Sequence, residues 1–433
     1  MAAEGASFAA MRHAETRQKL IALVTLGSLG DLHPCLALGA RLQQQGCRIR
    51  IVTTEFYRSR VEQLGFEFRA LRPDLDPTSA TLIGSCDDLK KGPEILFRQV
   101  ILPHLQDTYI DLVRALEGVD CMLAGELVYA APLAAEKLGL RWASMILSPC
   151  SFFSEDDPPV LVNAPWMRSL RKAGRLPYRT AMTLVRMATR HWWNPVRLLR
   201  RQEGLRQDCD PLLKDKFSPH RVLALFSSWL AEPQRDWPAQ TIQTGFVFHE
   251  EQGAVLDSSL EVERFLQLHP RPLVFTLGST AVGYPGAFFP TSIEASKRLH
   301  AAALLIGATR RPEWVSPSIF SVPYLPYAQI FPRASVIVHQ GGSGTTGQAL
   351  RAGRPMLFVP WGWDQPDNAQ RAVRRGSALT IPKDRYNARL AADAMEQLRS
   401  EAGFAQQAAA AARQMELEPG LAAASAAVLE MLP

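Results

Sequence analysis

The chain has 433 residues, of which 47% are hydrophobic and 21% are charged. This length allows two or three domains with large cores, and the composition excludes a disordered or fibrous protein. No stretch approaches the roughly 18 consecutive apolar residues that a transmembrane helix needs. The net charge of +6 is mild and is compatible with nucleic acid, a membrane surface or phosphorylated ligands.

The N-terminal segment and the cysteines indicate an intracellular protein. Residues 1–18 carry charges where a signal peptide needs an apolar stretch, so we expect a disordered leader on a soluble, cytoplasmic chain. The six cysteines form no CxxC pair and no zinc-like spacing, which favours buried thiols. The nine histidines include no HExxH, and we expect no metal site.

Strands and helices alternate along the first half of the chain. The apolar run 19–25 is followed by a glycine turn and by a helical pattern from Pro34 to Gln45. Residues 160–215 are helical and basic. We predict further strands at 48–54, 121–125, 142–147 and 222–228. A helix that ends near Gly139 is expected between the strands at 121–125 and 142–147.

A second series begins after a proline-spaced passage. Its strands, each followed by glycines and a helical run, are expected at 271–280, 302–308, 335–342 and 356–361. This alternation predicts two facing, doubly wound α/β domains. We expect a leader at 1–18, an N-terminal domain at 19–240 and a C-terminal domain at 241–412. A final helix at 413–433 is expected to pack back on the N-terminal domain.

The most informative segment runs from Tyr324 to Gly376. Residues 335–338 form a predicted buried strand with His339 at its carboxyl end, and a glycine turn then leads into a helix that begins with hydroxyl residues. A helix N-terminus after a glycine turn binds anions through free N–H groups and the helix dipole. Added hydroxyl groups and an imidazole suit a diphosphate. The spacing is neither GxGxxG nor a P-loop.

This segment resembles the donor-binding signature of family 1 nucleotide-sugar glycosyltransferases of the GT-B fold. It reads H-x-G-G-x-G-T-x-x-x-A-L-x-x-G-x-P, followed by P-x-x-x-D-Q-x-x-N-A. Bacterial rhamnosyltransferases of rhamnolipid synthesis and sterol glucosyltransferases look most similar. Residues 25–54 resemble the acceptor-side start of the same family, and 271–280 the start of its second domain.

The resemblance assigns the nucleotide-sugar donor to the C-terminal domain. It implies that His339 contacts the diphosphate and that Asp364 and Gln365 bind the sugar, with Trp363 beside them. Tyr324 aligns with a base-stacking residue. The remaining implied phosphate contacts are Ser279, Thr280, Gly341, Gly342, Ser343, Gly344, Thr345 and Thr346. Gly347 departs from the plant members, which place a ribose-binding Glu there, so UDP and dTDP donors are both left open.

The resemblance also implies a general base on the acceptor side. Asp31 falls where plant relatives carry a catalytic His, and an acceptor hydroxyl must lose its proton as it attacks. His33 is an alternative base, and Glu126 occupies about the position of the acid that supports the plant His. Gly30 and Trp361 are assigned to the acceptor.

Structural roles remain open for the same residues. Asp31 could be the N-cap of a helix entered at Pro34, and the sole role of Asp364 could be to initiate a helix. His339, Trp361 and Trp363 could be core residues.

The stretch 166–206 holds eleven Lys and Arg residues against Glu203 alone. It could be a solvated helical face, or a surface for peripheral contact with anionic lipid. Nucleic-acid binding is disfavoured because no recognised module accompanies the charge.

The expected function is therefore an inverting, metal-independent glycosyltransferase. It would use a UDP- or dTDP-sugar as co-substrate, no cofactor, and a lipophilic acceptor, as a monomer or dimer. The alternatives are a sugar-nucleotide epimerase on the same fold and a non-catalytic helper of a transferase. Retention of His339 and of Asp364–Gln365 argues against the helper.

Overall fold

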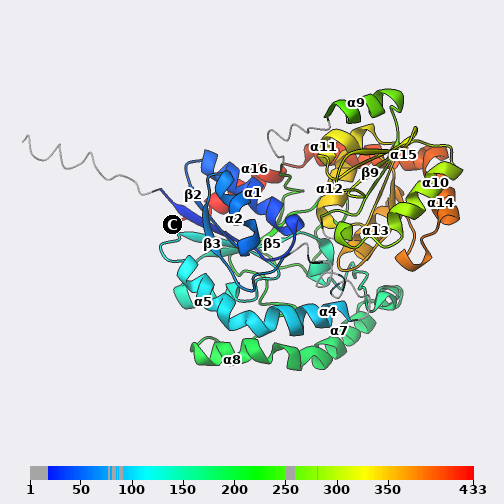
Figure 1. The fold of residues 1–433 in the computed structure, drawn as a ribbon. Coiled ribbons are helices and arrows are strands. Elements are labelled where there is room, and N and C mark those ends of the chain that lie inside the picture. The colour runs from blue at the N-terminus through cyan, green and yellow to red at the C-terminus, as the bar shows by residue number, and fades with distance from the viewer. Residues whose placement is uncertain are drawn as a thin grey trace, which may run out of the picture.

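The computed structural model describes residues 18–76, 79, 84, 86, 91–249, 259–279 and 281–433. Within them, the chain forms two α/β domains, each built on a seven-stranded sheet. Figure 1 shows the domains side by side, each with helices packed on its sheet. This confirms the predicted pair of doubly wound domains. All but the last residue of the expected leader lies outside the described residues.

The first sheet is parallel throughout, with the order β3-β2-β1-β4-β5-β6-β7. β1 is apolar and fully buried, as a central parallel strand covered on both faces requires. Strand β7 extends this sheet past the boundary predicted at 240. The strands are β1 (Leu20–Val24), β2 (Arg48–Thr53), β3 (Glu67–Ala70), β4 (Cys121–Gly125), β5 (Trp142–Ile146), β6 (Arg221–Ala224) and β7 (Thr241–Gln243).

The second sheet has the order β10-β11-β9-β8-β12-β13-β14 and is parallel except for β10. We expected a helical run after the strand at 302–308, but a hairpin of β10 and β11 follows it instead. The strands are β8 (Leu273–Thr276), β9 (Ala303–Ile306), β10 (Glu313–Ser316), β11 (Ile319–Val322), β12 (Val336–His339), β13 (Met356–Phe358) and β14 (Ala378–Thr380).

The helices of the N-terminal domain cover both faces of its sheet (Figure 1). Gly139, in the left-handed conformation, ends α6 as the sequence predicted. The α-helices are α1 (Leu29–Gln44), α2 (Arg58–Gln63), α4 (Gly92–Ile95), α5 (Leu105–Ala115), α6 (Ala131–Leu138), α7 (Arg175–Thr189) and α8 (Asn194–Gln202).

Helix α1 begins at Leu29, before the predicted start at Pro34. Ser28 is its N-cap, and Asp31 is the third residue of a capping box with Ser28. The interpretation of Asp31 as an N-cap is therefore wrong. A capping box satisfies two free N–H groups, which starts the helix upstream of the proline.

The C-terminal half holds α9 (Ser259–Leu268), α10 (Phe288–Arg298), α11 (Tyr327–Ile330), α12 (Ser343–Arg351), α13 (Gln365–Arg374), α14 (Ala388–Ser400), α15 (Ala402–Leu417) and α16 (Gly420–Leu429). The final helix predicted at 413–433 is thus two helices. α15 packs on α12, whereas α16 crosses to the N-terminal domain and packs on α1 (Figure 1).

Candidate active site

The two domains share a cavity of about 420 Å³. Ser28 and Leu29, at the start of α1, line it from the N-terminal domain, and Ser279, in the turn after β8, lines it from the C-terminal domain. Both lie just beyond the carboxyl ends of parallel strands, which is where open α/β sheets place ligands. The cavity therefore lies between the two domains, and of the predicted site residues Ser279 lines it.

Asp31 lies at this edge of the N-terminal domain. Its Oδ2 accepts hydrogen bonds from the amide of Ser28 at 2.8 Å and from the Ser28 hydroxyl at 3.1 Å. Burial raises the pKa of Asp31 to about 6, against the lowering effect of these hydrogen bonds, and the charge of Glu126 raises it further. A carboxylate with a pKa near 6 is ionised at neutral pH and still basic enough to accept a proton.

The two other candidate bases have different surroundings. The His33 ring lies 5.3 Å from the His249 ring, tilted by 37°, and its Nε2 lies 3.4 Å from Arg60. Burial, and then these two neighbours, lower the pKa of His33 to about 3. Such an imidazole is a weak base. Glu126 accepts a hydrogen bond from Ser151 at 2.7 Å and lies 3.6 Å from the buried ammonium group of Lys216.

Asp364 faces these carboxylates from the C-terminal domain. Burial raises the pKa of Asp364 to about 7, and the charges of Asp31 and Glu126 add to this effect. Asp364 occupies the N-cap position of α13, but its side chain caps no backbone amide. Its Oδ2 accepts a hydrogen bond from Asn368 at 2.8 Å. Helix initiation alone does not explain this placement.

His339 is fully buried at the end of β12. The Gly341 amide donates to its Nδ1 at 3.1 Å, and burial lowers its pKa to about 3, so the neutral ring carries its proton on Nε2. This Nε2 has no hydrogen-bond partner among the described residues. A buried N–H group without a partner is costly, which indicates a ligand position beside it.

The turn between His339 and α12 opens toward a ligand. Gly341 adopts φ +100°, and a Cβ there would lie 2.9 Å from the Phe358 ring. Gly344, in the first turn of α12, would have nothing within 4 Å of an added Cβ. The first hydrogen bond of α12 runs from Thr346 N to Gly342 O, which leaves the amides of the preceding residues available to an anion.

Three of the predicted phosphate-binding hydroxyl groups differ in their availability. Thr346 Oγ1 is buried without a partner among the described residues. The Ser343 hydroxyl donates to the Leu147 carbonyl of the N-terminal domain, so only the Ser343 amide is left for phosphate. The Thr345 side chain hydrogen-bonds with Tyr327.

Gln365 and the two tryptophans near it lie in the loop after β13 and at the start of α13. Gln365 Oε1 accepts hydrogen bonds from the amides of Trp361 and Gly362, at 2.8 and 3.2 Å. Trp363 has a left-handed backbone, with φ 57°, and packs against the apolar cluster around Val128 and Tyr129 of the N-terminal domain. Such a strained conformation in a bulky residue is typical of functional sites.

The assignment of Trp361 to the acceptor is not supported by its position. The side chain is 2% exposed in the core of the C-terminal domain, with Tyr284 and Lys383 on its ring. Its apolar ring and burial make it a core residue.

The remaining predicted residues lie at the surface. Gly30, in the first turn of α1, and Ser279 are exposed. Tyr324 is 45% exposed. Thr280 lies outside the described residues.

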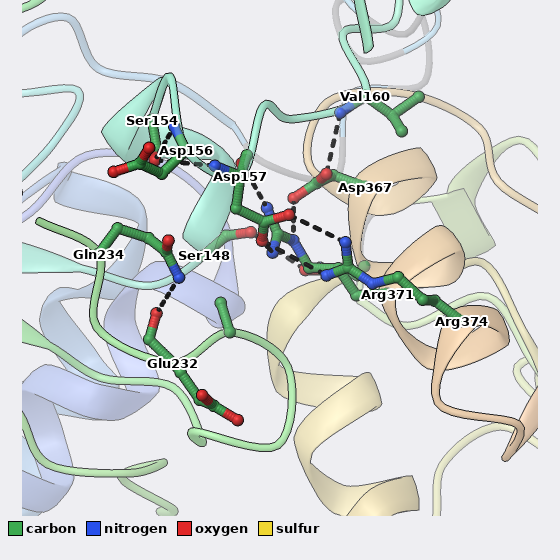
Figure 2. Close-up of polar contacts among 12 residues, drawn as sticks. Ser148, Ser154, Asp156, Asp157, Val160, Glu232, Gln234, Asp367, Arg371 and Arg374 are labelled. Carbon is green, nitrogen blue, oxygen red and sulfur yellow. Dashed lines mark hydrogen bonds and ion pairs between the residues drawn. The ribbon is translucent and has the colours of Figure 1, made fainter. Parts of the chain in front are cut away.

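Sequence reasoning missed a polar network that joins the domains behind the site. Figure 2 shows Asp157, from the loop after β5, between Arg371 and Arg374 of α13. Asn368, also on α13, accepts a hydrogen bond from Ser148 at 3.1 Å. The excess of polar residues on α13 was visible in the sequence, but their partners lie more than 200 residues away.

Two family models match the chain. The N-terminal domain of glycosyltransferase family 28 matches residues 21–141, and the C-terminal domain of the erythromycin biosynthesis protein CIII-like family matches 303–431. The O-mycaminosyltylonolide 6-deoxyallosyltransferase of Streptomyces fradiae is 32% identical over 381 residues, which cover 85% of this chain and 86% of that protein. The chain belongs to the nucleotide-sugar glycosyltransferases of the GT-B fold.

More distant relatives place the glycosyltransferase in the same family. A sterol 3-beta-glucosyltransferase of Arabidopsis thaliana is 24% identical and matches 95% of this chain, which spans 66% of that protein. A sterol 3-beta-glucosyltransferase of Leptosphaeria maculans is 25% identical, and the match spans 25% of its length.

Solved structures share the fold of the glycosyltransferase. The glycotransferase of kitacinnamycin has a TM-score of 0.69 at 20% identity, over 96% of this chain and all of that one. The glycosyltransferase VinC in complex with DTDP has a TM-score of 0.67 at 20% identity, over 95% and 99%.

Proposed function

We propose that this glycosyltransferase is an inverting, metal-independent enzyme without a cofactor. It moves a hexose or deoxyhexose from a UDP- or dTDP-sugar to a hydroxyl group of a lipophilic acceptor such as a lipid, sterol, polyketide or flavonoid-like molecule. One observation supports it above the others: the buried Nε2–H of His339 has no hydrogen-bond partner among the described residues, and it lies beside the glycine turn that leads into α12.

In the proposed reaction, the acceptor hydroxyl attacks the anomeric carbon and Asp31 takes its proton. The bond to the diphosphate breaks on the opposite face of the sugar, which inverts the anomeric centre. The amides at the start of α12 and the His339 Nε2–H stabilise the charge on the leaving diphosphate. Asp364 holds the sugar hydroxyls during the attack.

The names of the relatives guide the choice of substrates. One relative is a deoxyallosyltransferase named for O-mycaminosyltylonolide, others are named for sterols, and one similar structure is titled as a complex with DTDP. We therefore propose a panel of UDP- and dTDP-sugars against polycyclic and long-chain alcohols, read by mass spectrometry. Products that gain one hexose or deoxyhexose are expected. Transfer only to free sugars or peptides would reject the proposed acceptor class.

Metal independence rests on the chemistry of the diphosphate site. Helix amides and a neutral imidazole N–H supply the stabilisation that a divalent cation supplies elsewhere. Turnover should therefore survive excess chelator. Loss of turnover in chelator, with rescue by Mg²⁺ or Mn²⁺, would contradict this part of the proposal.

We also propose peripheral contact with an anionic membrane. Among the described helices, none combines the length and apolarity that crossing a bilayer requires. Helices α7 and α8 lie on the outer side of the N-terminal domain (Figure 1). They and the preceding residues expose five large apolar side chains among the basic residues of 166–206, namely Trp166, Leu176, Leu184, Met187 and Leu198. Apolar residues flanked by cations suit the interface of anionic lipid.

Vesicle sedimentation tests this contact. The protein should sediment with vesicles containing phosphatidylserine and less with neutral vesicles. The variant Leu176→Ser/Leu184→Ser should bind them more weakly, whereas Val315→Ser, an exposed apolar side chain of the other domain, should bind like the wild type. Equal binding by both variants would reject the surface.

A further inference from the structure

Helix α13, whose first turn follows Asp364, is attached at three points to residues 148–160 of the N-terminal domain, the segment after β5. Ser148 donates to Asn368 Oδ1 at 3.1 Å, the Val160 amide donates to Asp367 Oδ1 at 2.9 Å, and Asp157 pairs with Arg371 and Arg374. The segment is thus held against one face of the helix along its length (Figure 2).

The ionic part of this attachment is buried and balanced in charge. Arg371 donates to Asp157 and, at 2.6 Å, to Asp367, while Arg374 lies 2.9 Å from Asp157 Oδ1. Asp157, Asp367 and Arg371 are 7%, 2% and 3% exposed. Burial alone would raise the pKa of Asp157, but the hydrogen bond of Arg374 and the charge of Arg371 lower it to about 2. The carboxylate therefore stays ionised throughout the pH range in which Asp31 titrates.

A buried ion network of this kind defines geometry better than it adds stability. Desolvation of the charges offsets much of their attraction, and apolar side chains of similar volume would stabilise an interface as well. Charged hydrogen bonds, however, are directional, and they allow one alignment of the two partners. The network is thus suited to fixing how α13 sits on the N-terminal domain.

The same helix transmits this alignment to the site. Asn368, fully buried one turn into α13, donates to Asp364 Oδ2 at 2.8 Å and to the Gly341 carbonyl at 3.0 Å. It therefore joins the sugar-binding carboxylate, the glycine turn beside His339 and, through Ser148, the N-terminal domain.

The segment that carries Asp157 is itself supported. The Ser154 hydroxyl accepts the amides of Asp156 and Asp157, each at 3.1 Å, and donates to Asp236 at 2.8 Å. Figure 2 shows Ser154 and Asp156 beside Asp157. The hydrogen bonds of Ser154 therefore fix the turn that carries Asp157, and this fixed turn limits movement of α13 against the N-terminal domain.

We propose that Asp157 and Arg371 are positioning residues for sugar transfer: by docking α13 on residues 148–160, they hold Asp364 in place opposite Asp31. The proposal rests on the proposed function of Asp364 as a sugar ligand. It assigns to the acceptor domain a part in holding the donor sugar. The ion pairs of Asp157 run to Arg371 and Arg374 of α13 and not to β12 or α12, so we expect their loss to affect the sugar more than the diphosphate.

The test uses Asp157→Asn, which keeps the shape of the side chain and removes its charge. Calorimetry compares the binding of UDP and dTDP with that of their hexose conjugates, and turnover is measured with the best donor. We expect unchanged affinity for the free diphosphates, a loss of the extra affinity that the sugar confers, and a fall in kcat of up to about 100-fold from misalignment. Arg371→Lys should retain more kcat than Arg371→Gln.

Two further variants complete the design. Glu232→Gln removes an exposed ion pair between the same helix end, at Arg375, and the N-terminal domain, and should behave like the wild type. Arg374→Gln removes the more exposed of the two arginine partners of the Asp157 carboxylate and should show a smaller effect in the same direction. This variant keeps the test decisive if Asp157→Asn does not fold.

Three results would overturn the proposal. They are wild-type sugar affinity and kcat in Asp157→Asn, equal losses for free diphosphate and nucleotide sugar, and equal effects of Glu232→Gln. Failure of the wild-type protein to bind any nucleotide sugar would instead reject the proposed function on which the proposal rests.

Discussion

At the scale of single residues, the account depends most on Asp31. Replacing it with Asn preserves its size and an oxygen that can accept from the Ser28 amide, but removes the charge that takes the proton. Turnover should fall by roughly 10²–10⁴-fold, while nucleotide affinity and Tm stay near wild type. A role in the capping box alone predicts little change, and near-wild-type turnover would move the base to Glu126 or His33.

The pH dependence of the wild type should agree with this assignment. Protonated Asp31 cannot accept a proton, and its pKa is about 6. The ratio kcat/KM should therefore fall as the pH drops through about 6, and the residual activity of Asp31→Asn should lack this limb. An unchanged limb in the variant would assign it to another group.

His339 should act on the diphosphate rather than on the fold. His339→Ala removes the Nε2–H donor and should weaken binding of UDP or dTDP by about 1.5–3 kcal/mol, the value of a hydrogen bond to a charged group. Calorimetry measures this loss directly. Unchanged affinity together with wild-type turnover would give His339 a purely structural role.

Asp364 makes a prediction about stability. Its pKa is raised from 3.8 to about 7 in the folded protein, so the folded state binds this proton more tightly than the unfolded state. The resulting stabilisation is present at acidic pH and is lost as the pH rises from about 4 to about 7. Asp364→Asn lacks this loss, so its Tm relative to wild type should be higher at pH 8 than at pH 5. A Tm difference that does not change with pH would contradict the burial of this charge.

At the scale of elements, glycine substitutions at the start of α12 should affect stability and nucleotide binding differently. Gly344 lies in a helix with open space around it, so Gly344→Ala should fold and gain up to about 1 kcal/mol in stability. Its methyl group would stand at the proposed diphosphate site, and we expect weaker nucleotide binding. Gly341→Ala is the contrasting variant, because its φ of +100° and the Phe358 ring disfavour a side chain, and it should lose stability. Wild-type binding by Gly344→Ala would place the phosphates elsewhere.

The sequence predicted the elements whose local signals are strong. Apolar runs located the buried parallel strands, and the H-x-G-G-x-G-T turn located the end of β12 and the start of α12. The β10–β11 hairpin was missed because β10 exposes two of its four residues and lacks an apolar run. The start of α1 was misplaced because Pro34 is a common first helical residue, whereas the capping box of Ser28 and Asp31 acts earlier in the chain.

At the scale of the whole molecule, the site exists only where the domains meet. Asp31, Glu126 and Asp364 were predicted from separate motifs, but their interaction depends on domain packing. Asp157 and Arg371 are 214 residues apart, and no periodicity or motif relates them. α16 likewise returns to α1, the helix that carries Asp31. Contacts of this range follow from tertiary packing and lie outside what local patterns can predict.

This arrangement makes the central claim testable in one measurement. Asp31 and the proposed diphosphate site lie on opposite domains, and we propose that attack and departure occur on opposite faces of the sugar. The anomeric configuration of the product, read from NMR coupling constants after transfer from an α-linked UDP- or dTDP-sugar, should be β. An α-linked product would show retention and would contradict the single displacement that the account assigns to Asp31, Asp364 and His339.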